Sequence, residues 1–173
     1  SGAYRKSESE SNFYVSLSQN LPGGNDAGTG AFQGDPTANP ARPPARDGAR
    51  PNYLVGRWGF NHNRALSGDW QFRWGMSGQV TRDMLISGEQ FGIGGADSVR
   101  GFPEREMISH NGYRGTPELY GPDYGAKGPI AGARWRFLTF HDCGGSLRLR
   151  PPVPDSLAPH VRRPRPRLLL STR

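Results

Sequence analysis

Residues 70–81 read Trp-Gln-Phe-Arg-Trp-Gly-Met-Ser-Gly-Gln-Val-Thr, and this stretch carries the clearest fold signal in the chain. If it is extended, large apolar side chains fall on one face: Trp70, Phe72, Trp74, Met76 and Val80. Polar side chains fall on the other face: Gln71, Arg73, Ser77, Gln79 and Thr81. The stretch therefore predicts a strand with one apolar and one hydrated face. This periodicity fits a strand of a soluble sandwich as well as a strand of a transmembrane barrel.

Four further segments alternate in a similar way, near residues 13–19, 53–62, 112–120 and 131–142. Pro117 puts the pairing of the 112–120 segment in doubt, because proline has no N–H to donate to a strand ladder. Segments near ten residues with aromatic ends, such as Tyr53 and Trp70, favour a barrel wall whose aromatic side chains lie at the membrane interfaces.

The long loop and the composition of the chain also favour a barrel wall over a compact soluble domain. Residues 22–51 are rich in Gly, Pro, Ala, Asn and Asp, and about 30 residues of such loop are unusual in a compact soluble domain. Hydrophobic residues are only 34% of the 173, with 25 Gly and 16 Pro, which argues against a thick soluble core. No run of about 18 apolar residues is present, which excludes a transmembrane helix. We predict an all-β fold, with residues 1–143 forming part of a transmembrane antiparallel β-barrel with long loops.

A glycine-rich stretch lies within the predicted loop 82–110. Residues 91–102 read Phe-Gly-Ile-Gly-Gly-Ala-Asp-Ser-Val-Arg-Gly-Phe. This stretch closely resembles the loop motif of outer-membrane two-partner secretion transporters, the haemolysin secretion/activation family, in which a Val-Arg-Gly-Phe or Val-Arg-Gly-Tyr loop tucks into the barrel lumen. The motif positions here are Gly94, Gly95, Ser98, Val99, Arg100, Gly101 and Phe102. The resemblance extends over roughly residues 13–142.

The resemblance also implies a partner for the loop arginine. In the family this arginine reaches an aspartate on a neighbouring strand, within a Phe-x-Asp-x-Gly setting that Phe140 and Asp142 match here. A guanidinium in a lumen is tolerable when a carboxylate accepts its planar donors, and losing one partner leaves a costly charge. We therefore expect an Arg100–Asp142 salt bridge. This expectation is wrong if reversing both charges in a full-length transporter does not rescue the single mutants. Composition alone would leave Arg100 a solvated loop residue.

The resemblance implies a transporter, and no enzyme, that exports and activates a haemolysin- or adhesin-like protein across the bacterial outer membrane. Its expected partners are the secreted protein, the outer-membrane lipid and the barrel assembly machinery; no nucleic acid, cofactor or metal is expected. The chain begins without an initiator Met or a signal segment, so we expect an interior piece of a longer protein. Five strands cannot close a barrel, and such a truncated piece is expected to be inactive alone.

Other residue patterns point to no chemistry. The stretch 92–95 lacks the third glycine and the following helix of a dinucleotide-binding loop. His141 and Cys143 would share a strand face that Asp142 does not, which argues against a cysteine hydrolase. The four histidines have no metal-ligand spacing.

The alternation stops after Gly144, and the remaining residues are rich in Arg and Pro. Residues 144–173 hold seven of the 22 Lys and Arg and one of the 15 Asp and Glu, so they carry +6 of the net charge of +7. We predict a disordered tail without strands and hypothesise a shifted reading frame after Asp142. That hypothesis is abandoned if no other frame of the coding DNA continues with barrel strands. The alternative is a soluble β-rich module whose basic arm binds nucleic acid or anionic lipid.

Overall fold

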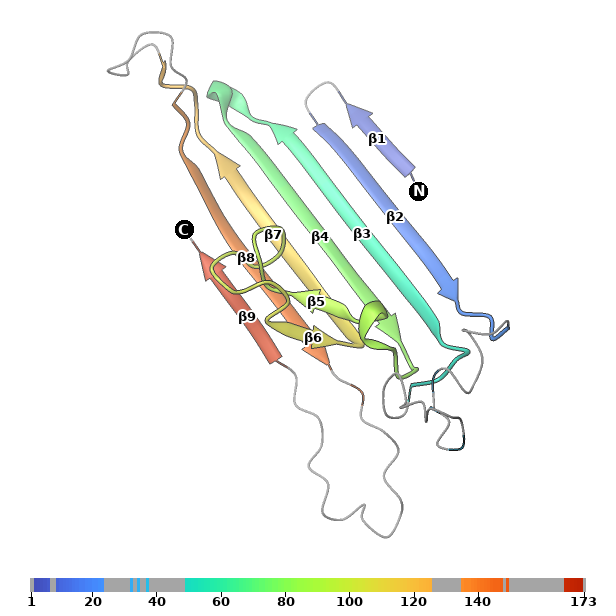
Figure 1. Ribbon diagram of the computed structural model, residues 1–173. Coiled ribbons are helices and arrows are strands. Elements are labelled where there is room, and N and C mark those ends of the chain that lie inside the picture. The colour runs from blue at the N-terminus through green and yellow to red at the C-terminus, as the bar shows by residue number, and fades with distance from the viewer. Residues whose placement is uncertain are drawn as a thin grey trace.

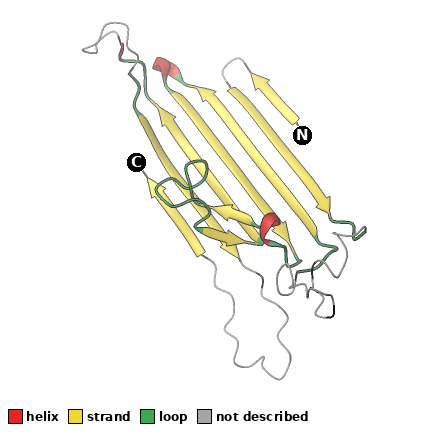
Figure 2. Cartoon of the chain, viewed as in Figure 1, coloured by secondary structure: helices red, strands yellow, loops and turns green. Residues whose placement is uncertain are grey.

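The computed structural model describes residues 2–6, 9–23, 49–125, 135–147 and 167–172, together with the single residues 32, 34, 37 and 149. These residues form one large antiparallel sheet in the order β1-β2-β3-β4-β7-β8-β9 and a small sheet of β5 and β6 (Figure 1, Figure 2). The all-β prediction is therefore confirmed.

The strands of the large sheet have these bounds: β1 (Gly2–Lys6), β2 (Ser9–Gln19), β3 (Leu54–Ala65), β4 (Gln71–Thr81), β7 (Asn111–Tyr120), β8 (Leu138–Leu147) and β9 (Arg167–Thr172). The small sheet pairs β5 (Phe91–Ile93) with β6 (Met107–Ser109). The described part of the chain also holds two single-turn 3-10 helices, η1 (Ser67–Asp69) and η2 (Ser87–Glu89). Within the described ranges, no helix has the length and apolar character needed to cross a membrane.

Five of these strands overlap the five segments with alternating sequence, and the C-terminal part differs from expectation. The strand predicted over 131–142 begins at Leu138 and runs on to Leu147, past the expected boundary at Gly144. Residues 131–134 lie outside the described part of the chain. Of the tail predicted to be disordered, the structure describes residues 144–147, 149 and 167–172, and it does not test the prediction at 148, 150–166 and 173.

The expectation that no strand follows Gly144 is wrong at residues 167–172. This segment forms β9, which pairs antiparallel with β8 from Ser146↔Arg167 to His141↔Thr172. A free strand edge offers a row of N–H and C=O groups that an extended segment can pair with, whatever its side chains. Leu168 and Leu170 are exposed and lie opposite Gly145 and Cys143 in the ladder.

Pro117 lies inside β7 without ending the strand. The ladder with β4 is continuous from Gln71↔Tyr120 to Gln79↔Gly112 and includes Pro117. On the other side, the paired residues of β7 and β8 step from Gly115↔Cys143 to Glu118↔Phe140. The missing N–H thus coincides with a gap in one ladder only, as expected from proline.

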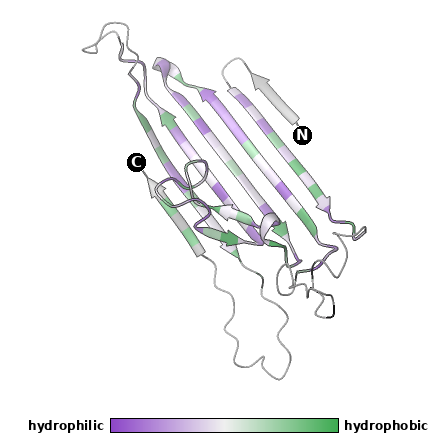
Figure 3. Cartoon of the chain, in the orientation of Figure 1, coloured by the Kyte–Doolittle hydropathy of each residue, from purple (hydrophilic) through white to green (hydrophobic). Residues whose placement is uncertain are grey.

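The two faces of the sheet differ in chemistry, and hydrophobic and hydrophilic bands alternate along its long strands (Figure 3). One face, here called the apolar face, carries Val15 and Leu17, which are 74% and 72% exposed. Trp58 shares this face because it pairs directly with Val15 in the register. The opposite face, here called the polar face, carries residues such as Arg57 and Arg114 and is the one on which the 82–110 loop lies.

Buried side chains gather under the loop. One cluster lies where the loop leaves and rejoins the sheet, and consists of Phe32, Ala49, Tyr53, Val55 and Leu85, with Ile86 packed against it. The second lies inside the loop and consists of Ile93, Val99 and Met107, with Phe91 and Phe102 packed against it. The loop therefore has a small core of its own on the polar face.

Candidate functional site

The candidate site is the docked loop between β4 and β7. After Thr81 the chain turns back over the polar face, and the β5–β6 hairpin and the loop beyond it lie across β7 and β8 (Figure 1). The hairpin is short, with Phe91 paired to Ser109 and Ile93 to Met107. The segment between its two strands, residues 94–106, carries the Val-Arg-Gly-Phe motif.

Glycine at two motif positions lets this segment turn sharply. Gly94 and Gly95 have φ angles of 112° and 103°, which side chains rarely tolerate. A Cβ on Gly94 would lie 2.4 Å from the carbonyl oxygen of Pro103. The turn is closed by the Gly95 N–H, which donates to Phe102 O at 3.1 Å, and Ser98 Oγ accepts from the Gly94 N–H at 3.3 Å. These bonds present Arg100 toward the sheet.

Arg100 makes a three-point contact with Asp142 on β8. Its Nε and Nη2 donate to Asp142 Oδ2 and Oδ1 at 2.7 and 2.8 Å, and its backbone N–H donates to Oδ2 at 2.9 Å. The Asp142 side chain is fully buried, whereas that of Arg100 is 26% exposed. Hydrogen bonding to Asp142 raises the pKa of Arg100 above its ordinary value, so the guanidinium stays charged. The guanidinium also lies 3.5 Å from the centre of the Phe140 ring, a cation–π contact.

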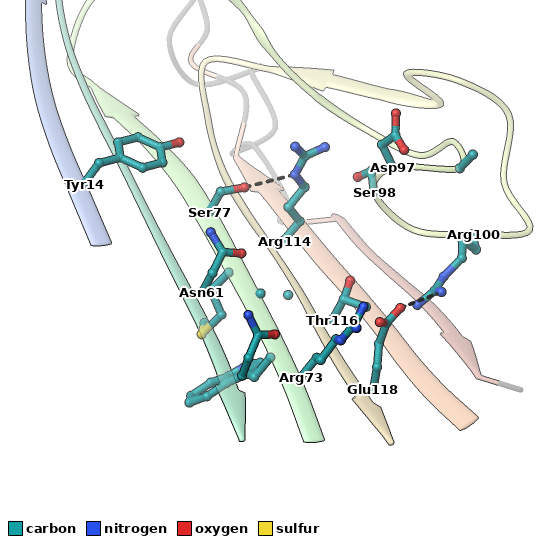
Figure 4. Close-up of a pocket in the computed structure, with 16 residues that line it drawn as sticks. Tyr14, Asn61, Arg73, Ser77, Asp97, Ser98, Arg100, Arg114, Thr116 and Glu118 are labelled. Carbon is teal, nitrogen blue, oxygen red and sulfur yellow. Dashed lines mark hydrogen bonds and ion pairs between the residues drawn. The ribbon is translucent and has the colours of Figure 1, made fainter. Parts of the chain in front are cut away.

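A second carboxylate, Glu118 on β7, completes the surroundings of Arg100. Arg100 Nη1 lies 2.8 Å from Glu118 Oε1 (Figure 4). Tyr120 donates its hydroxyl to Glu118 Oε2 at 2.9 Å. Sequence reasoning missed Glu118. Its only signal was an acidic residue on the polar side of a strand that Pro117 had made doubtful. One guanidinium thus forms ion pairs with two carboxylates, and removing Arg100 would leave both carboxylates without this counter-charge.

The third residue of the Phe-x-Asp-x-Gly setting, Gly144, forms the floor under the loop. A Cβ at this position would lie 2.5 Å from Ile93 Cγ2 and 3.1 Å from Val99 Cγ2. Contacts under 3.0 Å force something to shift, so only glycine leaves room for the loop core here. The Phe-x-Asp-x-Gly positions thus contact the loop on one patch of β8. Phe140 stacks against the Arg100 guanidinium, Asp142 pairs with it, and Gly144 leaves space for Ile93 and Val99.

A groove of about 530 Å³ runs beside the loop over the polar face (Figure 4). Its lining is mostly polar and comes from β2, β3, β4, β7 and the loop: it includes Tyr14, Asn61, Asn63, Arg73, Ser77, Asp97, Arg114 and Glu118. Arg114 Nε donates to Ser77 Oγ at 3.0 Å across the β4–β7 pair. Such a lining offers hydrogen bonds to a hydrated ligand and no apolar pocket.

The residues suspected of other chemistry do not converge. Cys143 is a free thiol whose Sγ lies 3.5 Å from Gly115 O, and as the neighbour of Asp142 it points to the apolar face. Among the described residues, no three His, Cys, Asp or Glu side chains come together as a metal site requires.

Comparison with known proteins places this chain in a family. The family model described as haemolysin secretion/activation protein ShlB/FhaC/HecB matches residues 8–146. The match includes the loop, Arg100, Glu118 and Asp142. No curated protein and no solved structure matches the chain significantly.

Proposed function

The chain belongs to the haemolysin secretion/activation family, and on this premise we propose that its sheet forms part of an outer-membrane barrel that exports a secreted partner protein. The family consists of two-partner secretion proteins and not of enzymes. In this proposal the apolar face contacts outer-membrane lipid, and the polar face lines the channel. The docked loop lies inside that channel, held by Arg100.

The observation that carries the proposal is the difference in chemistry between the two faces of the sheet. Val15 and Leu17 expose most of their surface on the apolar face, where a soluble protein would bury them. The opposite face instead buries a charged carboxylate, Asp142, under a loop. This combination of lipid-compatible exterior and polar, loop-filled interior is typical of a barrel wall.

The sheet needs further strands to work as a channel. Among the described residues, β1 and β9 each have a strand neighbour on one side only, so the sheet is an open wall. Unpaired backbone groups in lipid cost several kcal/mol each, which would make an isolated wall unstable in a membrane. We therefore propose that these strands act only within a closed barrel, folded into the membrane by the barrel assembly machinery, and that the open sheet alone exports nothing.

The cargo that fits is an unfolded or extended polypeptide, in the proposal a haemolysin- or adhesin-like protein. The groove offers amide, hydroxyl and guanidinium groups that an extended backbone can hydrogen-bond while it passes. We propose that passage is passive and that the loop must release part of the groove for it. Arg100 would then set how readily the loop does so.

Two measurements test the proposal. In liposomes with brominated acyl chains that hold the closed transporter, the fluorescence of Trp58 and Trp74 should be quenched. Unquenched emission would show that the apolar face does not contact lipid. In bacteria producing the transporter with its partner, Arg100→Ala should lower the fraction of partner in the medium. The exposed Arg82, outside the groove, offers the matched control Arg82→Ala. Equal secretion by both variants would remove the loop from the mechanism.

A further inference from the structure

Both ends of the loop are tied to one buried side chain, Gln79 of β4. Its amide Nε2 donates to the backbone oxygen of Glu89, near the start of the loop, at 2.9 Å. The same nitrogen donates to the backbone oxygen of His110, where the loop ends, at 3.1 Å. Gln79 is only 5% exposed. A single amide group thus holds the outgoing and the returning chain side by side.

Arg57 on β3 completes this arrangement. Its Nε donates to Gln79 Oε1 at 2.9 Å, and its Nη2 pairs with Glu89 Oε2 at 2.5 Å. Both N–H groups and the oxygen of the Gln79 amide therefore have partners, which fixes the orientation of the amide. We call Gln79, Arg57 and Glu89 the root clamp.

The root clamp and the Arg100 contact attach the loop to different strands. The clamp joins the loop to β3 and β4, whereas Asp142 and Glu118 join the loop tip to β8 and β7. Beside the clamp, Leu85 is fully buried in the cluster with Val55 and Tyr53. At the tip, Ile93 and Val99 of the loop core pack against Gly144 of β8. Hydrogen bonds therefore tie the root to β3 and β4, and the Arg100 ion pairs tie the tip to β7 and β8.

We propose that Gln79 and Arg57 are positioning residues that fix the root of the loop, so that on release of Arg100 the loop turns as an arm about the clamp. The role of this motion in export rests on the proposed function above. The existence of the pivot does not rest on that function, because the movement of the loop can be measured without any transport. Each hydrogen bond lost from the clamp should raise the population of root-detached loop roughly tenfold.

The experiment measures tip and root separately by spin-label distances in the full chain in detergent micelles, with Cys143→Ser removing the native thiol. Label pairs at Ala96→Cys with Ser67→Cys report the tip, and pairs at Ser87→Cys with Ser67→Cys report the root. These three positions are exposed. A residue with a purely structural role would change both distances or neither.

The expected results separate the two attachments. Arg100→Ala should shift and broaden the tip distance and leave the root distance unchanged. Adding Gln79→Ala should broaden the root distance as well, whereas the control Gln71→Ala, on the same strand and face, should not. Glu89→Arg should broaden the root distance, and adding Arg57→Glu should restore it in part, because the bond from Arg57 Nε to Gln79 Oε1 is lost. Since Glu89 lies in the loop, its variants test the clamp even if Gln79→Ala destabilises the sheet.

Two outcomes would overturn the inference. If Arg100→Ala alone broadens the root distance, the loop leaves as a whole and no pivot exists. If the root distance survives both Gln79→Ala and Glu89→Arg, the apolar cluster alone holds the root. A failed secretion test would leave these distances unaffected, so the failure of the proposed function and the failure of the clamp are distinguishable.

Discussion

The contact between Arg100 and Asp142 makes a quantitative prediction about how firmly the loop is docked. The perturbation is a double-mutant cycle with Arg100→Ala, Asp142→Ala and both together. The cycle isolates the side-chain interaction, because the hydrogen bond from the Arg100 backbone N–H to Asp142 survives in Arg100→Ala.

The magnitude follows from the contact geometry. Two side-chain hydrogen bonds join ionised groups, at 2.7 and 2.8 Å. Each such bond is worth about 1.5–3 kcal/mol net. The Arg100 side chain is 26% exposed, so water screens the pair and the lower end of that range applies. The expected coupling energy is therefore about 3 kcal/mol, which is roughly 150-fold in the ratio of docked to undocked loop. Arg100→Ala alone should cost at least as much, because it leaves a buried carboxylate without its counter-charge.

The assay is the reaction rate of a thiol placed in the loop core. Val99 is fully buried, so a cysteine in its place, in a Cys143→Ser background, reacts with a maleimide only when the loop opens. The ratio of the reaction rate to that of the unfolded chain gives the free energy of opening for each corner of the cycle. A coupling below about 1 kcal/mol would refute the reasoning. The loop would then be held by its packing and backbone bonds, and not by the ion pair.

Three further predictions use the same thiol assay. Gly144→Val should undock the loop, because a side chain there collides with Ile93, and Gly144→Ala should do so less severely; protection equal to that of the parent would show that the loop can shift away. Glu118→Gln should weaken docking by about 1 kcal/mol, less than the loss of Asp142 does, because Glu118 is partly exposed and accepts only one of the guanidinium contacts. An effect as large as that of Asp142→Asn would contradict this ranking. Reversing both charges at Arg100 and Asp142 should restore docking only in part. The Asp142 carboxylate that accepts the Arg100 backbone N–H is lost, and the acidic side chain placed at position 100 would face Glu118. Full restoration would show that these two contacts contribute nothing.

Local sequence predicted the long strands well, for a physical reason. Alternation with a period of two is a property of neighbouring residues, and it marks residues 70–81, which include β4, whatever lies beside them. The same reasoning failed for β9, because residues 167–172 show no alternation and become a strand by pairing with the edge of β8. The doubt that Pro117 raised about its strand applies to one side only: the ladder with β8 is interrupted there, while the ladder with β4 continues.

The partner of Arg100 was expected from the family resemblance and not from local pattern. Composition alone left Arg100 a solvated arginine, and no periodicity connects it to a residue 42 positions further along the chain. Glu118 and the root clamp had no sequence signal that distinguished them from other polar residues on strands. Each depends on which residues of separate strands lie opposite each other.

The sequence by itself determined that this protein alternates between an apolar and a polar side and that a glycine-rich loop presents one arginine. These are local properties, set by side-chain periodicity and by the backbone freedom of glycine. Only the tertiary structure decided which carboxylates the arginine meets and which glutamine holds the loop root. The register between β4, β7 and β8 fixes those contacts, and a shift of one residue would turn Gln79, Glu118 and Asp142 to the opposite face.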